Sequence, residues 1–154
     1  MTLQSDRLPV VVAGLRTPFA STGPVFQEST GAELARFATR QMLYRTELPG
    51  HEVDAVIFGQ VVPSPLVPNV AREVSLLPQL PRTVPAYALN RACASGAQAV
   101  ANAAEEIRAG QADTVIAGGV ELLSDVPILH TRRFARTLVA ASKAKTLGQR
   151  LALF

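Results

Sequence analysis

The chain has 154 residues, of which 48% are hydrophobic and 18% charged, with a formal net charge of +3. This length and hydrophobic content suit one globular domain with its own core. A single cysteine excludes an internal disulfide framework and fits a reducing compartment. No apolar run approaches the ~18 residues of a membrane span, and residues 1–9 lack the apolar region of a secretory signal. We therefore expect a cytoplasmic protein.

The positive charge belongs to the end of the chain. Residues 1–125 contain nine basic and twelve acidic residues, whereas residues 126–154 contain six basic residues and no acidic one. This basic segment can meet the phosphates of a small ligand, an anionic membrane surface or an acidic partner subunit, or it can simply be solvated. Nucleic acid is not expected as a partner, because no nucleic-acid-binding motif accompanies these charges and Phe134 is the only Phe, Tyr or Trp between Arg132 and Arg150.

Predicted strands and helices alternate along the chain. Four short apolar runs predict buried strands, at residues 8–13, 55–59, 85–89 and 114–117. Proline-rich stretches at residues 63–68 and 78–85 predict loops. Because helical patterns lie between the strands, we expect an α/β fold in which helices cover a sheet.

Two helices have clear start signals. Thr30 and Glu33 have the spacing of a capping box, and Asn69 can cap a shorter helix that Pro78 stops. The first helix is expected to place one set of residues on a common face: Leu34, Phe37, Ala38 and Met42. The second is expected to do the same with Val70, Val74 and Leu77.

The only cysteine lies at a predicted strand-to-helix turn, in the sequence Asn90-Arg91-Ala92-Cys93-Ala94-Ser95-Gly96. The alanine-rich helix that follows is stopped by Gly110, so Cys93 is expected at or just before its first turn. Unpaired backbone N–H groups there favour a thiolate and can hold the oxyanion of a carbonyl under attack. On this motif alone, a nucleophile and a small core cysteine are equally open interpretations.

Other motifs carry less weight. Ser95 is not in a hydrolase elbow, because Cys93 and Ala97 occupy its glycine positions; we expect it to satisfy the helix start or pack in the turn. Residues 118–119 lack the rest of a phosphate loop, so we expect close backbone packing or positive φ there. Glu121 is expected to bond to nearby backbone. No cluster of ligands has metal-binding spacing, so no metal is expected.

The sequence around Cys93 resembles the nucleophile loop of thiolases. Further motifs follow in the family's order: residues 11–19 resemble its opening strand and turn, 54–61 its second strand, 69–72 the start of its next helix, and 117–121 the strand end before its loop region. The resemblance implies a thiolase-like first half, with a mixed, mostly parallel sheet in residues 1–125 and the start of an inserted loop region in residues 126–154. Residues 124–130 and 143–151 are most similar to the fatty-acid-oxidation branch, including the thiolase subunit of the trifunctional complex.

The resemblance also implies an activity. Cys93 would be the nucleophile that carries an acyl thioester while 3-ketoacyl-CoA is cleaved, with coenzyme A as a substrate and no separate cofactor. A supporting turn would be formed by Asn90, Arg91, Ser95 and Gly96, and the CoA-binding residues stay unassigned. The family's G-H-P, C-x-G and N-E-A-F motifs do not occur in these 154 residues. We therefore expect little or no turnover from the chain alone, and either a homodimer or a partner chain that supplies the second half.

Two other functions remain open at this point. A thiolase can serve the condensing direction and form acetoacetyl-CoA, and the residues that would decide this are not readable from the sequence. Alternatively, the chain can be a non-catalytic binding or assembly subunit that keeps the fold. High reactivity of Cys93 toward alkylating reagents would favour a catalytic role over the second possibility.

Overall fold

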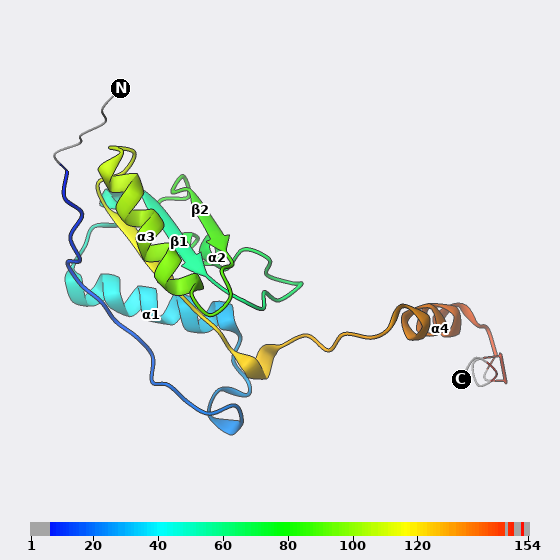
Figure 1. The fold of residues 1–154 in the computed structure, drawn as a ribbon. Coiled ribbons are helices and arrows are strands. Elements are labelled where there is room, and N and C mark those ends of the chain that lie inside the picture. Colours follow the sequence, from blue (N-terminus) through cyan, green and yellow to red (C-terminus); the bar gives the residue numbers. More distant parts are fainter. Residues whose placement is uncertain (1–6, 147, 150–151, 153–154) are drawn as a thin grey trace.

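The computed structural model describes residues 7–146, 148–149 and 152. Within this part, three strands form one parallel sheet in the order β2-β1-β3 (Figure 1). The strands are β1 (Ala55–Gly59), β2 (Ala86–Leu89) and β3 (Val115–Gly119). Phe58 in the central strand pairs with Ala88 on one side and with Gly118 on the other. The α/β fold expected from the alternating pattern is confirmed, and the sheet of the described residues is parallel throughout, where the resemblance implied a mixed, mostly parallel one.

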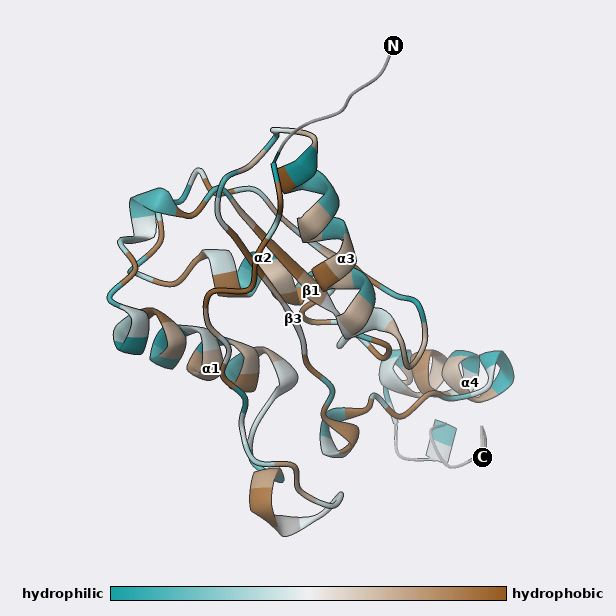
Figure 2. Ribbon diagram, turned by 60° about the vertical axis from the view of Figure 1, so that its left-hand side comes forward, coloured by the Kyte–Doolittle hydropathy of each residue, from teal (hydrophilic) through white to brown (hydrophobic). Residues whose placement is uncertain are grey.

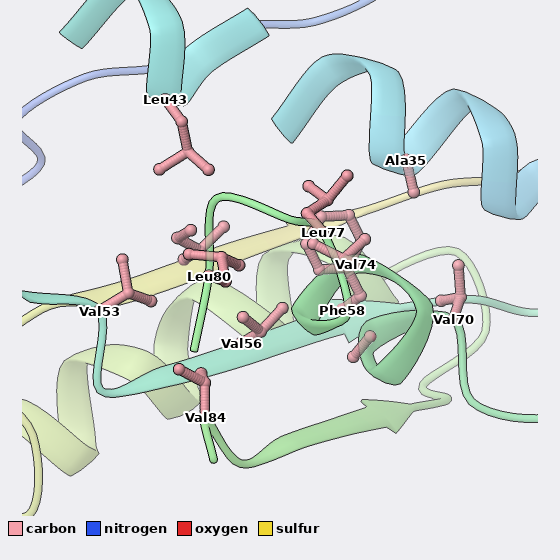
Figure 3. Close-up of a cluster of buried hydrophobic side chains, with 12 residues drawn as sticks. Ala35, Leu43, Val53, Val56, Phe58, Val70, Val74, Leu77, Leu80 and Val84 are labelled. Atoms are coloured by element: carbon pink, nitrogen blue, oxygen red, sulfur yellow. The ribbon is translucent and has the colours of Figure 1, made fainter. Parts of the chain in front are cut away.

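Helices cover both faces of this sheet. Helix α3 (Ser95–Arg108) lies on one face, and α1 (Gly31–Thr46) and α2 (Val70–Ser75) lie on the other (Figure 1). The alternation of side chains along β1 divides the core accordingly. Val56 and Phe58 pack with α1, α2 and the loop that follows α2 (Figure 3). Ile57 points to the other face and packs under α3 against Ala99 and Ala103.

The predicted helix starts are confirmed by their hydrogen bonds. Thr30 Oγ1 accepts a hydrogen bond from the Glu33 N–H at 3.2 Å, and Glu33 Oε2 accepts one from the Thr30 N–H at 2.7 Å. Asn69 Oδ1 accepts from the Arg72 N–H at 3.1 Å and so caps α2. The apolar face predicted for α2 is also confirmed, because Val70, Val74 and Leu77 are buried.

The face predicted for α1 is wrong by about one residue. Its buried positions are Gly31, Ala35, Thr39 and Leu43. Small side chains at three of these positions allow the helix to approach the sheet closely, so the bulkier neighbours lie at the edge of the contact. Phe37 is 50% exposed, and the Arg40 guanidinium lies 5.8 Å from the centre of its ring.

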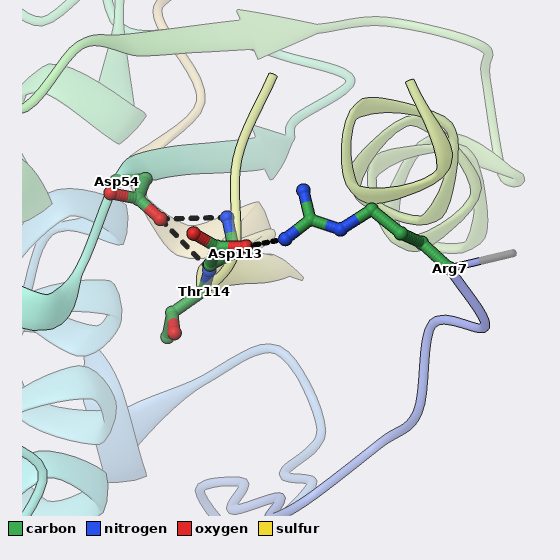
Figure 4. Close-up of polar contacts among 4 residues, drawn as sticks. All are labelled: Arg7, Asp54, Asp113 and Thr114. Atoms are coloured by element: carbon green, nitrogen blue, oxygen red, sulfur yellow. Dashed lines mark hydrogen bonds and ion pairs between the residues drawn. The ribbon is translucent and has the colours of Figure 1, made fainter. Parts of the chain in front are cut away.

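The strand predicted at residues 8–13 does not form. These residues have no regular secondary structure, and Val11 and Val12 are 84% and 90% exposed. β-Branched composition supplies strand propensity, but a strand also needs a neighbour to pair with, and neither described sheet edge pairs with this segment. The segment is instead attached at its start, where Arg7 forms an ion pair with Asp113 (Figure 4).

The strand β2 was predicted to be buried but is only half-buried, because it is an edge strand of the described sheet. The loop that enters β3 is well fixed. Asp54 Oδ2 accepts hydrogen bonds from the N–H groups of Asp113 and Thr114, at 2.7 and 3.0 Å (Figure 4). Short 3₁₀ turns complete the body of the fold: Pro24–Phe26, Gly50–Glu52 and Leu123–Asp125.

The basic segment contains a helix that was not predicted. After an extended stretch, α4 (Arg132–Lys143) begins at Thr131, whose Oγ1 accepts a hydrogen bond from the Phe134 N–H at 3.3 Å. Helix α4 stands apart from the α/β body (Figure 1). No helix in the described residues is long and apolar enough to cross a membrane. Residues 1–6 and Arg150, which the sequence arguments used, lie outside the described residues.

Candidate functional site

The three strands run in the same direction, so their carboxyl ends meet at one edge of the sheet. In open parallel sheets, ligands bind at this edge. The three loops that leave it begin at Gln60, Asn90 and Val120, directly after β1, β2 and β3. Cys93 lies in the second of these loops and is exposed. Cys93 therefore lies at the edge of the sheet where ligands bind in such folds, on the surface of the protein and outside its core.

The turn around Cys93 is held in an unusual backbone conformation. Ala92 has a positive φ of 46°, which costs a residue with a side chain roughly 1–2 kcal/mol. Two polar side chains stabilise it. Asn90 Oδ1 accepts a hydrogen bond from the Ala92 N–H at 2.9 Å, while Ser95 Oγ accepts from the Arg91 N–H at 2.8 Å and donates to the Ala92 carbonyl at 2.6 Å. Ser95 is buried and is fully engaged within the turn.

Cys93 directly precedes the positive end of a helix. Ala94 is the N-cap of α3, and no described side chain accepts a hydrogen bond from the N–H groups of its first turn. These groups and the helix dipole favour negative charge close to the helix start. The arrangement thus offers stabilisation both for a thiolate and for an oxyanion that forms beside it.

Glycines allow the start of α3 to pack directly on the strand ends. A Cβ atom at Gly59 would lie 2.3 Å from the Ser95 carbonyl carbon, and a Cβ atom at Gly119 would lie 3.1 Å from Gly96 Cα. The predicted close backbone packing at residues 118–119 is confirmed at Gly119. The same requirement at Gly59 was not predicted, because the residues around Gly59 in the sequence do not indicate that the backbone of Ser95 and Gly96 packs against it.

Side chains also join the three loops to one another. Glu121 Oε2 accepts a hydrogen bond from the Val61 N–H at 2.7 Å, and Asn90 Nδ2 donates one to the Val61 carbonyl at 2.8 Å. Glu121 also reaches the N–H of Val62, at 3.4 Å. The prediction that Glu121 bonds to nearby backbone is confirmed. As a result, Val61 connects the loop that carries Cys93 to the loop after β3.

A chain of polar side chains runs from the Cys93 turn along α3. Arg91 donates to Gln98, Gln98 donates to Asn102 at 2.7 Å, and Asn102 donates to the Tyr87 hydroxyl at 3.1 Å. Tyr87 in turn donates to Glu106 at 3.2 Å. Burial raises the pKa of Tyr87 and the Glu106 carboxylate adds to this effect, while the hydrogen bond from Asn102 opposes it. Sequence reasoning missed this chain, although three of its members recur every four residues on the alanine-rich helix.

One cavity of the described residues lies close to the end of β3 but does not include Cys93. It has a volume of about 480 Å³ and is lined by residues 15–22, α1 and the end of β3. No group of three or more His, Cys, Asp or Glu side chains in the described part is arranged to hold a metal ion. The five residues singled out from the sequence lie together where β2 leads into α3: Asn90, Arg91 and Cys93 in the connecting turn, and Ser95 and Gly96 at the start of the helix.

Comparisons with known proteins agree with this arrangement. Residues 9–152 match the family model described as thiolase, N-terminal domain. The chain is 43% identical over 154 residues to a 3-ketoacyl-CoA thiolase of Cronobacter sakazakii and 44% identical to one of Klebsiella pneumoniae. It spans only 35% of the length of these relatives.

A solved structure is similar as well. The crystal structure of the Bacillus anthracis acetyl-CoA acetyltransferase matches with a TM-score of 0.75 and 34% identity, over 83% of this chain and 33% of that one. Sequence and structure therefore agree over most of the chain, and the chain belongs to the thiolase family, whose N-terminal domain it contains.

Proposed function

We propose that Cys93 is the nucleophile of an acyl transfer between thioesters of coenzyme A. The observation that supports this most directly is its position. Cys93 is the only cysteine of the chain, it is exposed, and it lies immediately before α3 at the carboxyl edge of the sheet. A small core cysteine, the other interpretation of the motif, would be buried.

The reaction proposed for the complete protein is the thiolytic cleavage of a 3-ketoacyl-CoA. The Cys93 thiolate attacks the 3-keto carbon, and the oxyanion that forms is stabilised by the N-terminal end of α3. The C2–C3 bond then breaks, C2 takes a proton, and acetyl-CoA leaves. Finally, the thiolate of a second coenzyme A attacks the Cys93 thioester, which releases the shortened acyl-CoA and restores the Cys93 thiolate.

The residues around Cys93 would hold the nucleophile in position and would not themselves transfer protons. Asn90 and Ser95 hold the backbone around Cys93, and Gly119, which has no Cβ, allows α3 to lie close to β3 at Gly96. Arg91 is engaged with Gln98 and would support the turn from outside. We also propose that residues 1–125 form the catalytic N-terminal domain and that residues 126–154 begin a loop region that follows it.

The names of the relatives favour the degradative direction, because those that are 43% and 44% identical are 3-ketoacyl-CoA thiolases. The similar structure from Bacillus anthracis is an acetyl-CoA acetyltransferase. Its name supports, as the second candidate, an enzyme that joins two acetyl groups. Both reactions use the same cysteine thioester, and they differ in the length of the acyl chain that the site accepts.

The test uses the assembly purified from its own cells, so that any chain that supplies further catalytic residues is retained. The wild-type assembly is expected to cleave a 3-ketoacyl-CoA, and incubation with substrate should leave an acyl group on the peptide that contains Cys93, detected by mass spectrometry. Cys93→Ala should abolish both signals. Normal turnover by Cys93→Ala would end the assignment. A series of acyl lengths then separates the two candidate reactions.

A further inference from the structure

Strands β1 and β3 are joined by a carboxylate at each end. The two strands lie side by side between the helices, and β1 is hydrophobic along most of its length (Figure 2). At their amino ends, Asp54 accepts hydrogen bonds from the N–H groups of Asp113 and Thr114 (Figure 4). At their carboxyl ends, Glu121, which follows β3, accepts hydrogen bonds from two successive N–H groups that follow β1. The two carboxylates therefore make the same kind of connection between the same strands.

The connection at the carboxyl end continues to the turn that carries Cys93. Val61 is held by both of its backbone polar groups: its N–H donates to Glu121 Oε2 at 2.7 Å, and its carbonyl accepts from Asn90 Nδ2 at 2.8 Å. The same Asn90 side chain accepts a hydrogen bond from the Ala92 N–H at 2.9 Å. Three hydrogen bonds thus lead from Glu121 to the residue that directly precedes Cys93.

Each residue along this path depends on the one before it. Ala92 has a φ of +46°, which residues with a Cβ atom avoid, so it keeps this conformation only where its neighbours hold it. Asn90 is exposed, and packing therefore does not fix its amide; the Val61 carbonyl orients it. Val61 lies in a loop without regular secondary structure, where the Glu121 carboxylate supplies the acceptor for its N–H.

We propose that Glu121 is a positioning residue for Cys93 and acts through Val61 and Asn90. The proposal rests on the proposed role of Cys93 as the nucleophile. Glu121 fixes Val61, Val61 orients the Asn90 amide, and Asn90 holds Ala92 in the conformation that keeps Cys93 directly before α3. On this mechanism Glu121 acts through the hydrogen bonds that it accepts and not through its charge, so an uncharged acceptor of the same length serves equally well.

Two substitutions of Glu121 test the mechanism in the assembly purified from cells that produce each variant. Glu121→Ala removes the acceptor and should lower kcat for 3-ketoacyl-CoA on the order of 100-fold, as a displacement of about 1 Å does, with KM much less affected. Glu121→Gln keeps an acceptor oxygen without the charge and should recover most of kcat. The rate at which iodoacetamide alkylates Cys93 should change in Glu121→Ala and stay near the wild-type rate in Glu121→Gln. Equal losses in the two variants would indicate a role for the charge and overturn the proposal.

Asp54→Ala is the matched control. It removes a carboxylate that binds two successive N–H groups and joins the same two strands, but at their other end, roughly 16 Å away along β1. In urea unfolding it should destabilise the protein as Glu121→Ala does, while kcat and the alkylation rate of Cys93 stay near the wild-type values. If Asp54→Ala lowered kcat as much as Glu121→Ala, the effect would be a general loosening of the strand pair and the proposal would be wrong.

A substitution of Asn90 tests the path itself. Asn90→Asp keeps an acceptor for the Ala92 N–H but loses the donor to the Val61 carbonyl, so it should reproduce the effects of Glu121→Ala. The double variant should be little worse than either single one, because both changes interrupt one path. Losses that multiply would contradict a path through Val61. Normal turnover by Cys93→Ala would refute the proposed function, whereas the alkylation rates test the path without reference to turnover.

Discussion

Gly59→Ala tests whether the Cys93 turn depends on backbone packing. The added Cβ would lie 2.3 Å from the Ser95 carbonyl carbon and 2.5 Å from both the Ser95 carbonyl oxygen and the Gly96 nitrogen. Non-bonded carbon atoms rest at about 3.5–4.0 Å, so the contact is too short by more than 1 Å. All three atoms belong to the backbone of the first turn of α3, and no rotamer change can relieve the overlap. We therefore expect a loss of about 3 kcal/mol in the free energy of unfolding, at the upper end of overpacking costs.

The control for this experiment is Gly118→Ala. Its Cβ would lie 3.4 Å from the ring of Phe58, an ordinary contact, and the chemical change is the same in the neighbouring strand. Urea unfolding followed by circular dichroism measures both variants, and the alkylation rate of Cys93 under native conditions reports the turn. Gly59→Ala should be the less stable and should change the alkylation rate, while Gly118→Ala should change neither by much. Equal stability of the two variants, with unchanged alkylation, would refute the close packing of α3 on β1.

Three further predictions concern single side chains. Asn69→Ala should cost about 1 kcal/mol in urea unfolding because it removes the cap of α2 and the bond from Asn69 Nδ2 to the Ala86 carbonyl. Asn69→Asp should recover only the part due to the cap, because a carboxylate cannot donate to that carbonyl; equal stability of Asn69→Ala and the wild type would contradict the capping role. Glu121→Ala should speed hydrogen exchange at Val61 and Val62, whose N–H groups it binds, and leave exchange within α1 unchanged; protection at both sites would show that the bond is dispensable. Tyr87 in a Tyr44→Phe background should titrate above its ordinary pKa of 10.0, and Glu106→Gln should lower that pKa. Because folding raises the pKa of Tyr87, the neutral phenol stabilises the folded state fully below pH 10, and this contribution is lost as the pH rises through the pKa of the folded protein. A phenolate absorbance titration that gives a pKa at or below 10.0 would contradict the raised pKa.

Features that depend on a few neighbouring residues were predictable. The capping box at Thr30 and Glu33 and the cap at Asn69 consist of contacts within three residues, so the residue types alone indicate them. The turn that carries Cys93 is equally local, since it joins a short apolar strand to a helix of small residues. The start of α4 has a comparable local signal: Thr131 can cap a helix, and Phe134 and Leu138 are four residues apart. This helix was not predicted, because no strand precedes it and no glycine follows it closely to mark its ends.

Features that depend on distant partners were not predictable. Residues 8–13 have the composition of a buried strand, yet a strand forms only where an edge pairs with it. The exposure of Phe37 depends on how closely Ala35 and Thr39 approach the sheet, which spacing within the helix does not determine. The hydrogen bonds from Asn90 and Glu121 to Val61 span 29 and 60 residues. The sequence therefore shows which polar side chains are available, but it does not show that they bond to the loop that contains Val61.

The geometry of the site also indicates where its proton chemistry must come from. The ionisable groups nearest the turn are already engaged, Arg91 with Gln98 and Glu121 with Val61. His51 precedes β1 in the turn Gly50–Glu52, so it lies at the opposite end of the sheet from Cys93, roughly 16 Å away along a five-residue strand. His130 lies in the stretch before α4, with its ring 5.0 Å from that of Phe134.

Among the hydrogen bonds of the described residues, neither histidine bonds to Cys93 or to the side chains that hold its turn. The described residues contribute a thiol, the positive end of α3 and a fixed turn, all of which act on negative charge at sulfur and oxygen. Acid–base catalysis needs a group within hydrogen-bond reach of the reacting atoms. Under the proposed function, that group must come from a part of the protein other than these residues, so the reactivity of Cys93 toward alkylation and the turnover of 3-ketoacyl-CoA are separable. The chain alone can have the first property without the second.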